Sequence, residues 1–354
     1  MVLGKWRMVK SSLWRQVHRG LHVPNNSLLV FGSNTDVGKT LVSTGLLKFK
    51  PSSRQGLYVK PVQTGDVHDA HFVHQHCQLT ESLSVRTLYH WKLATSPHIA
   101  ARSSPNIPAD SEVVRRIQEE MESFLRRFHD CPTFVLVESA GGVLSPGPSG
   151  SLQASMYHRL RLPAVLVGDS RLGGISATIA AYEALFTRAY QIPIIVLIDS
   201  DDGLSDQYGN AAFLDEYFQK LHAKSTSSLT ETPHVIRLTP IPSDKSIPLN
   251  EWFDKNQSSF SIINNLLDSF IFDYDQKLLQ MHHQGMHRVW WPFTQHQNVS
   301  KNDVTLIESA QQDDFHTITS FEQEHQISDE VYVNGLATRN MFDACASWWT
   351  QVTF

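Results

Sequence analysis

The stretch Leu28–Thr40 reads LLVFGSNTDVGKT, in which a short apolar run leads directly into a loop with two glycines and a lysine. The run at 28–31 has the length and composition of a buried parallel strand. Residues from Lys39 to about Phe49 then have helical character. A loop between such a strand and the start of a helix directs backbone N–H groups at an anion. The stretch therefore predicts the phosphate-binding loop of a nucleotide-binding α/β domain.

Three consecutive residues of this loop have the chemistry that a nucleoside triphosphate requires. Gly38 lets the backbone approach the phosphates, the Lys39 ammonium suits the β and γ oxygens, and the Thr40 hydroxyl is a ligand for Mg²⁺. The usual pattern has its first glycine six residues before the lysine, where this chain has Ser33 and places Gly32 one residue earlier. A chance Gly-Lys-Thr turn is the alternative, but the flanking strand and helix favour a nucleotide loop.

Further apolar runs alternate with helical segments along the chain. Strands are expected at 57–62, 133–137, 164–167, 194–198 and 234–238, and helices at 111–128 and 175–186. The first of these helices is amphipathic, and Asp110 or Ser111 is expected to cap it. This alternation predicts a mostly parallel sheet with helices on both faces. Ligands of such sheets bind beyond the carboxyl ends of the strands. The residues expected at or near those ends are Gly32, Lys60, Glu138, Gly168 and Asp199.

Two of these residues complement the loop. Glu138 is expected to end an apolar strand, where a carboxylate would bind Mg²⁺, although a solvated acid is the simpler alternative. Taken alone, Lys60 is most simply a surface lysine. At the carboxyl ends of the strands, where ligands bind, it would stabilise a transferred phosphoryl group. Asp69 stands in a histidine-rich segment (68–76). Zinc is not favoured there, because no closed tetrahedral set of ligands is visible.

Composition narrows the function classes. The chain has 354 residues and a formal net charge of -5, which gives no reason to expect nucleic-acid binding. It contains no apolar run near the roughly 20 residues of a membrane helix. Its three cysteines form no CxxC pair, which argues against a disulfide framework and a structural zinc site.

The two ends of the chain differ from its centre. Before Asp36 the sequence has five lysines and arginines and no acidic residue. We interpret residues 1–25 as a mitochondrial transit segment directed to the matrix, with a disordered basic tail as the alternative. Beyond Asp273 the chain is rich in Gln and His. We therefore expect one domain over 26–275 and a separate segment over 276–354.

Several motifs together resemble the dethiobiotin synthetase family. The loop Gly32–Thr40 is followed, in the order and approximate spacing of that family, by KPVQTG at 60–65, TSPH at 95–98, VESAGG at 137–142 and RLGGI at 171–175. The resemblance covers about residues 26–245. The motifs identify the family as a set, whereas no single motif other than the phosphate loop would be enough to identify it.

The C-terminal segment resembles a second enzyme. The motifs WWPFT at 290–294 and FDACASWW at 342–349 are similar to the N-terminal part of diaminopelargonic acid aminotransferase. Eukaryotic bifunctional biotin proteins join these two enzymes in this order. The pyridoxal phosphate domain and its Schiff-base lysine have no counterpart before Phe354, so we expect a truncated aminotransferase remnant without transaminase activity.

The resemblance implies a reaction and a set of roles. One amine of 7,8-diaminononanoate captures CO₂ as a carbamate, ATP phosphorylates the carbamate, and the second amine closes a ureido ring. The implied catalytic residues are Lys39, Lys60 and Thr35. The implied Mg²⁺ ligands are Thr40, Asp69 and Glu138. The nucleotide would also contact Asp36, Val37, Gly38, Leu41, Gly141 and Asp199. The substrate would contact Thr64, Gly141, Gly173, Gly174 and Ser176, near the interface of a homodimer.

Three positions depart from the family pattern. Asn34 replaces the usual Asp, whereas Ser176 and Asp199 each replace an Asn found in bacterial members. An ionised Asp199 accepts hydrogen bonds but cannot donate them, so nucleotide selectivity would be relaxed.

Two other functions compete with the synthetase. A partner-switching ATPase would carry a second loop lysine where this chain has Asn34. A non-catalytic fragment would not need the intact loop, Lys60 and Glu138.

Overall fold

The computed structural model describes residues 26–66, 68–77, 82–200, 209–223, 232–244 and 246–283, with side chains described up to Ile271 in the last range. The predicted transit segment 1–25 lies outside the described residues. So do the aminotransferase-like motifs at 290–294 and 342–349. Residues Pro24–Asp275 form one compact unit.

The secondary structure alternates between strands and helices. The strands are β1 (Ser27–Gly32), β2 (Gln55–Thr64), β3 (Leu83–Trp91), β4 (Thr133–Gly142), β5 (Ala164–Val167), β6 (Ile194–Ile198) and β7 (His234–Leu238). The helices are α2 (Lys39–Lys48), α3 (Asp69–His76), α4 (Pro97–Ala100), α5 (Asp110–Arg127), α6 (Gln153–Tyr157), α7 (Gly174–Phe186), α9 (Asn210–Ala223), α10 (Leu249–Lys255) and α11 (Gln257–His283). Short 3₁₀ turns are η1 (Ala101–Ser103) and η2 (His158–Leu160).

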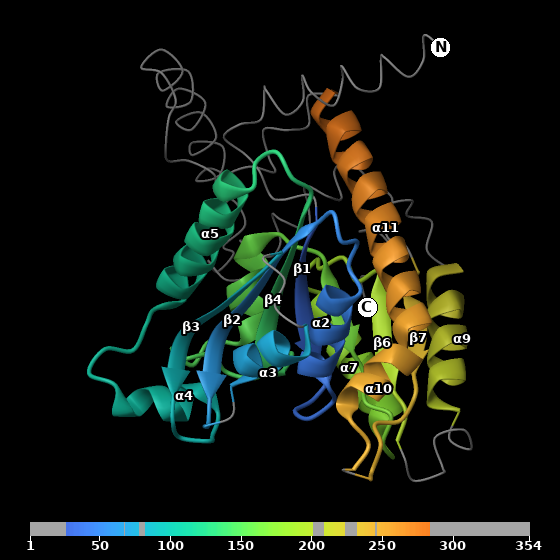
Figure 1. Cartoon of the computed structure of the whole chain (residues 1–354), viewed down its shortest axis with the longest axis horizontal. Coiled ribbons are helices and arrows are strands. Elements are labelled where there is room, and N and C mark those ends of the chain that lie inside the picture. The colour runs from blue at the N-terminus through green and yellow to red at the C-terminus, as the bar shows by residue number, and fades with distance from the viewer. Residues whose placement is uncertain are drawn as a thin grey trace, which may run out of the picture. The chain divides into compact units, whose positions relative to one another are not determined.

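The described strands form one seven-stranded sheet in the order β3-β2-β4-β1-β5-β6-β7, and every pairing is parallel. β1 lies in the middle, with β4 on one side and β5 on the other (Figure 1). The chain passes from β1 to β2 on one side of this strand and later crosses to β5 on the other side. The loop after β1 therefore lies where the direction of strand order changes, which is the usual ligand position in open α/β sheets.

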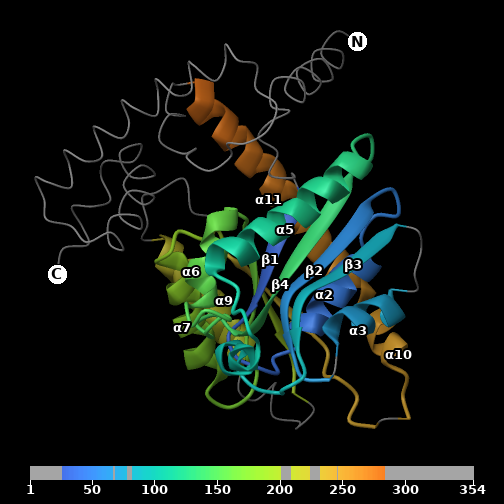
Figure 2. The ribbon, with the colours of Figure 1, turned by 90° about the vertical axis from the view of Figure 1, so that its left-hand side faces the viewer.

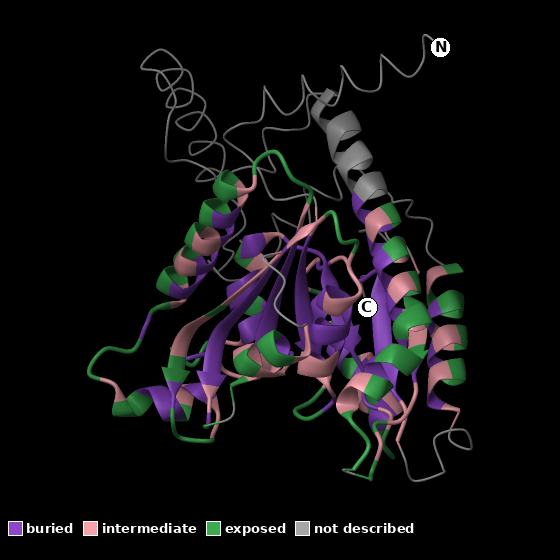
Figure 3. Cartoon of the chain, in the orientation of Figure 1, coloured by how far each residue is buried: buried purple, intermediate pink, exposed green. Residues whose placement is uncertain are grey.

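Helices cover both faces of this sheet (Figures 1 and 2). One apolar cluster includes residues of α5, α6, α7 and α9 packed on one face, with Phe31 and Val137 from the strands. The other cluster includes residues of α2, α10 and α11, with Val30 and Leu136 from the same strands. The central strands are buried along nearly their whole length (Figure 3). The expectation of a parallel sheet covered on both faces is confirmed.

Several sequence-based expectations about local structure were wrong. Strand β3 was not predicted. Strand β2 continues to Thr64, so Lys60 lies well inside the strand and not near its end, and β4 continues to Gly142, so Glu138 does not end it. The N-cap of α5 is Ala109, and no side chain caps this helix. Among the described residues, no helix is both long enough and apolar enough to cross a membrane.

Candidate active site

The phosphate loop connects β1 to α2 and packs too closely for side chains at its two glycines. Gly38 is the N-cap of α2 and has a φ of 92°, in the left-handed region that favours glycine. A Cβ atom there would lie 2.4 Å from Ile198 Cδ1 at the end of β6. A Cβ atom on Gly32 would lie 2.8 Å from the Asn34 carbonyl oxygen. The backbone is therefore free to approach an anion at the helix N-terminus, as the loop sequence predicts.

Local hydrogen bonds shape the residues between these glycines. The Ser33 N–H donates to the Val167 carbonyl of β5 at 2.8 Å, which ties the start of the loop to the sheet. Asn34 Oδ1 accepts a hydrogen bond of 2.8 Å from the Thr35 N–H, a contact that an aspartate oxygen would also provide. Asp36 has a φ of 57°, so the loop contains a non-glycine residue in the left-handed region.

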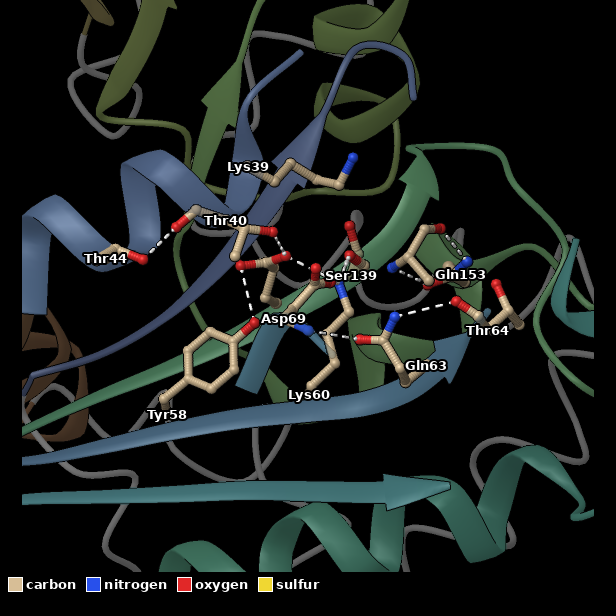
Figure 4. A network of polar contacts seen from close by, with 12 residues as sticks. Lys39, Thr40, Thr44, Tyr58, Lys60, Gln63, Thr64, Asp69, Ser139 and Gln153 are labelled. Atoms are coloured by element: carbon tan, nitrogen blue, oxygen red, sulfur yellow. Dashed lines mark hydrogen bonds and ion pairs between the residues drawn. The ribbon is translucent and has the colours of Figure 1, made fainter. Parts of the chain in front are cut away.

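The Glu138 carboxylate is the centre of a polar network, and Figure 4 labels its partners Thr40, Tyr58 and Lys60. Its Oε1 atom accepts hydrogen bonds from Thr40 Oγ1 at 2.9 Å and from Lys60 Nζ at 2.8 Å. Its Oε2 atom accepts a hydrogen bond from the Tyr58 hydroxyl at 3.0 Å. Glu138 has no solvent exposure, so these donors replace the water that a carboxylate requires.

Lys60 connects this carboxylate to a second one. Its Nζ atom lies 2.6 Å from Asp69 Oδ2 and also donates to the Ser139 carbonyl at 3.0 Å. Gln63 Oε1 accepts a hydrogen bond of 3.2 Å from the Asp69 N–H, which fixes the first residue of α3. The network therefore joins β2, β4 and the first residues of α2 and α3.

The two lysines of the site differ in electrostatic environment. Burial lowers the pKa of Lys60, but the Glu138 and Asp69 carboxylates outweigh this effect and hold that pKa above its usual value. The pKa of Lys39 is lowered to about 8, first by burial and then by the charge of Lys60. Lys39 Nζ donates to the Asn34 carbonyl at 3.3 Å. In the part of the chain that the structure describes, this ammonium forms no ion pair with a carboxylate, so it is suited to an incoming phosphate.

The donor set fits a nucleotide and a hard divalent cation. Thr40, Glu138 and Asp69 provide one hydroxyl and two carboxylates, which are the oxygen ligands that Mg²⁺ prefers. The backbone of the phosphate loop, which is exposed at its glycines, and the Lys39 ammonium complement phosphate oxygens. Among the described residues, no group of three or more His, Cys, Asp or Glu is placed to hold a metal.

Three more of the predicted residues lie at the carboxyl edge of the sheet. Gly141, with a φ of 75°, approaches Thr35 so closely that a Cβ atom on it would lie 3.8 Å from Thr35 Oγ1. Thr64 ends β2, and its carbonyl accepts a hydrogen bond of 3.1 Å from Gln63 Nε2. Thr35, Thr64 and Gly141 thus lie at the carboxyl edge of the sheet with Lys60 and Glu138.

Other predicted residues lie outside the Glu138 network. The Asp199 carboxylate forms a bidentate ion pair with the Arg237 guanidinium of β7. Arg237 Nη2 donates to Oδ2 at 2.7 Å, and Arg237 Nε donates to Oδ1 at 3.3 Å. Gly173 and Gly174 begin α7, and a Cβ atom on Gly174 would lie 1.9 Å from the Asp169 carbonyl oxygen. Gly173 and Ser176 line a shallow depression between α7 and α9, together with Leu172, Ile175, Ile179, Ala180, Glu183, Asn210 and Phe213.

Two residues of this network, Tyr58 and Gln63, were not predicted from the sequence; they contact Glu138 and Asp69, respectively. Tyr58 precedes Lys60 by two residues on one strand, so the two side chains point to the same face of the sheet. This two-residue spacing would identify Tyr58 as a site residue only if the pairing of β2 with β4 were already known.

Comparisons with known proteins agree with this geometry. A family model described as an AAA domain matches residues 26–246. The ATP-dependent dethiobiotin synthetase BioD of Lysinibacillus sphaericus (strain C3-41) is 33% identical, and the match covers 49% of this chain and 74% of that protein. This chain belongs to the dethiobiotin synthetase family.

Bifunctional members of this family match most of the chain. The mitochondrial bifunctional dethiobiotin synthetase/7,8-diamino-pelargonic acid aminotransferases of Oryza sativa subsp. japonica and Arabidopsis thaliana are 35% and 34% identical. The matches cover 91% and 93% of this chain but only 42% and 44% of those proteins. The chain therefore spans less than half the length of these dethiobiotin synthetase relatives, and its similarity to them extends beyond residues 26–246.

Proposed function

We propose that this chain is a dethiobiotin synthetase that uses ATP and Mg²⁺ to close a ureido ring on 7,8-diaminononanoate. The observation that carries the proposal is the convergence of Lys60, Glu138 and Thr40 beside the phosphate loop, with ion-pair and hydrogen-bond distances of 2.8 and 2.9 Å. Membership of the family supplies the substrate class.

The reaction balances without a further reactant. One amine of the substrate attacks CO₂, which is in equilibrium with bicarbonate, and loses a proton to form a carbamate. A carbamate oxygen attacks the γ-phosphorus of ATP and displaces ADP, giving a mixed carbamic–phosphoric anhydride. The second amine attacks the carbonyl carbon, and inorganic phosphate leaves as the ring closes.

The residues of the network match the demands of the phosphoryl transfer. Lys39 and Lys60 neutralise charge on the transferring group, and Thr35 lies beside the carbamate or the phosphate. Thr40, Glu138 and Asp69 would hold Mg²⁺, which supplies charge neutralisation at the phosphate oxygens when it is bound. The nucleotide is surrounded by residues of the loop and of the first turn of α2, namely Asp36, Val37, Gly38 and Leu41.

The substrate site extends from the network towards α7. Thr64 and Gly141 contact the reacting end of the diamine, whereas Gly173, Gly174 and Ser176 lie along its carboxylate tail. Asp199 lies near the base, since Ile198 touches the phosphate loop and Asp199 directly follows it. The resemblance implies an amide at the positions of Ser176 and Asp199 in bacterial members. Here these residues provide a hydroxyl and a carboxylate, so the hydrogen-bond donors that they offer differ from those of an amide.

The same region supports a homodimer. Leu172 is 84% exposed and Phe213 is 47% exposed, and both border the depression that contains Gly173 and Ser176. Large exposed apolar side chains around a concave surface indicate a protein interface. A second copy of the chain would cover them and enclose the substrate tail.

A mitochondrial location is supported by the N-terminal segment and by the names of the plant relatives. The acid-free basic segment at 1–25 suits import into mitochondria, and the plant relatives are named as mitochondrial proteins. The test is microscopy of the full chain with a C-terminal fluorescent protein. Replacing Arg7, Arg15 and Arg19 by Glu should abolish mitochondrial localisation, and unchanged localisation would refute this assignment.

The activity is tested by mass spectrometry of products from purified protein given ATP, ¹³C-bicarbonate and the diamine. We expect dethiobiotin carrying one ¹³C atom, and loss of this product in Lys39→Ala but not in Lys50→Ala. A partner-switching ATPase would hydrolyse ATP whether or not the diamine is present. A non-catalytic fragment would not hydrolyse ATP at all, and either result would refute the proposal.

A further inference from the structure

The two oxygens of the Glu138 carboxylate have different partners. Oε1 accepts from Thr40 and Lys60, the two residues that the proposed reaction uses. Oε2 accepts only the Tyr58 hydroxyl among the hydrogen bonds that the described residues form, at 3.0 Å (Figure 4). Tyr58 and Glu138 both have no solvent exposure. The nucleotide motifs assign no role to Tyr58, although it holds one side of the central carboxylate.

The strand pairing fixes the position of this phenol. Tyr58 of β2 pairs in register with Leu136 of β4, two residues before Glu138. Residues two apart on a strand point to the same face, so Tyr58, Lys60 and Glu138 share the face that α2 covers. The Tyr58 ring belongs to the apolar cluster that also contains Val42 and Leu46 of α2. A ring packed in this way has little freedom to move its hydroxyl.

The chemistry of the phenol suits a constant donor. The hydroxyl donates to Oε2 as a neutral group from a fully buried position. Because it is neutral, it satisfies the carboxylate without competing with a divalent cation for Oε1.

We propose that Tyr58 is a positioning residue that fixes Oε2 of Glu138, so that Oε1 faces Thr40, Lys60 and the divalent cation. This inference rests on the proposed function, because it takes Glu138 as a ligand of that cation. Hydrogen-bond donors behind a metal ligand orient it and typically change metal affinity by about 10- to 100-fold when they are removed.

The test compares Tyr58→Phe with Tyr157→Phe. Tyr157 is a matched control, because it is also fully buried and its hydroxyl has no hydrogen-bond partner in the described part of the chain. The readout is Mn²⁺ binding to the full chain, measured by water-proton relaxation in the presence of a non-hydrolysable ATP analogue. We expect Tyr58→Phe to weaken Mn²⁺ binding by about ten-fold or more. Tyr157→Phe should stay within two-fold of the unaltered protein.

The outcomes separate this inference from the proposed function. If the unaltered chain binds Mn²⁺ and forms product while Tyr58→Phe binds Mn²⁺ within two-fold of it, the positioning role is refuted and the synthetase assignment stands. If the unaltered chain binds no Mn²⁺ with the nucleotide analogue, the cation role of Glu138 and this inference are both refuted.

A second measurement needs no variant of Tyr58. In protein labelled at tyrosine ¹³Cζ, Glu138→Gln should shift one buried tyrosine resonance. Adding Mg²⁺ and the analogue to the unaltered protein should shift the same resonance. If no resonance responds to both changes, Tyr58 does not sense the cation through Glu138, and the inference is overturned.

Discussion

The Lys60 ammonium and the Glu138 carboxylate form an ion pair of 2.8 Å between the adjacent strands β2 and β4. Lys60 is only 3% exposed and Glu138 is not exposed. A buried pair of this kind loses its stabilising effect when one partner is removed, because the other charge stays buried without compensation. The pair therefore connects the stability of the sheet to the chemistry proposed for its edge.

Replacing Lys60 by Met should reduce both turnover and stability. We expect kcat to fall by about 100-fold or more, since a positive group at the transferring phosphoryl is lost, with a smaller change in the ATP dissociation constant. Unfolding in urea should show a loss of about 3 kcal/mol or more. Lys50→Met is the control, because Lys50 instead contacts Arg54 and Ser82. A near-normal kcat in Lys60→Met would show that Lys60 has no catalytic role.

Replacing Gly38 by Ala should disable the phosphate loop. The added Cβ would combine a left-handed backbone with a 2.4 Å clash against Ile198, so the loop must shift. We expect ATP binding, measured by calorimetry, to become undetectable. Gly150→Ala separates the two effects, because Gly150 has a φ of 96° but nothing within 4 Å of its Cβ position. That control should cost about 1 kcal/mol of stability and leave ATP binding intact. Equal ATP affinity in both variants would contradict the close packing of the loop.

His158 should make the protein less stable in mild acid. Its pKa is lowered to about 4, first by burial and then by Arg161 and Arg188. The unfolded chain takes up this proton near its ordinary pKa of about 6.5, so the free energy of unfolding falls as the pH drops from about 6.5 towards 4. The loss is up to about 3 kcal/mol. Urea unfolding at pH 7 and pH 5 should show a smaller loss in His158→Gln than in the unaltered chain. His129→Gln, at an exposed histidine, should behave like the unaltered chain.

Replacing Leu172 by Asp should weaken the proposed homodimer. A carboxylate at this 84% exposed position would have to be desolvated when a second copy covers it. We expect sedimentation equilibrium to show a dimer dissociation constant raised by about ten-fold or more. Ile247→Asp, at a 41% exposed apolar position before α10, should leave association unchanged. If Leu172→Asp associates as the unaltered chain does, the interface lies elsewhere.

The sequence predicted those parts of the fold that have an unambiguous apolar pattern. The run at 194–198 is β6, and each of its residues is buried, which is typical of a strand inside a parallel sheet. Strand β3 was missed because its sequence, LSVRTLYHW, mixes apolar and polar residues without an unbroken apolar run, and the strand is only partly buried. Its existence depends on pairing with β2, a neighbour that the sequence does not reveal.

The same distinction applies to the site. Linear motifs located Lys39, Thr40, Lys60 and Glu138, which the structure brings together. Tyr58 was not identified because it lies in the apolar run of β2, where a tyrosine is an ordinary core residue. Its hydroxyl reaches Glu138 only through the register of β2 with β4, a relationship between residues 80 positions apart.

The contact of Lys60 with both carboxylates affects the order in which ligands arrive. The site contains two lysines and two acids, namely Lys39, Lys60, Asp69 and Glu138, so its formal charges cancel. It therefore attracts a divalent cation only weakly when no nucleotide is bound. A triphosphate changes this balance by adding several negative charges beside Thr40. Mg²⁺ should therefore enter as the partner of the nucleotide, and calorimetry should detect strong Mg²⁺ uptake only after the triphosphate is present.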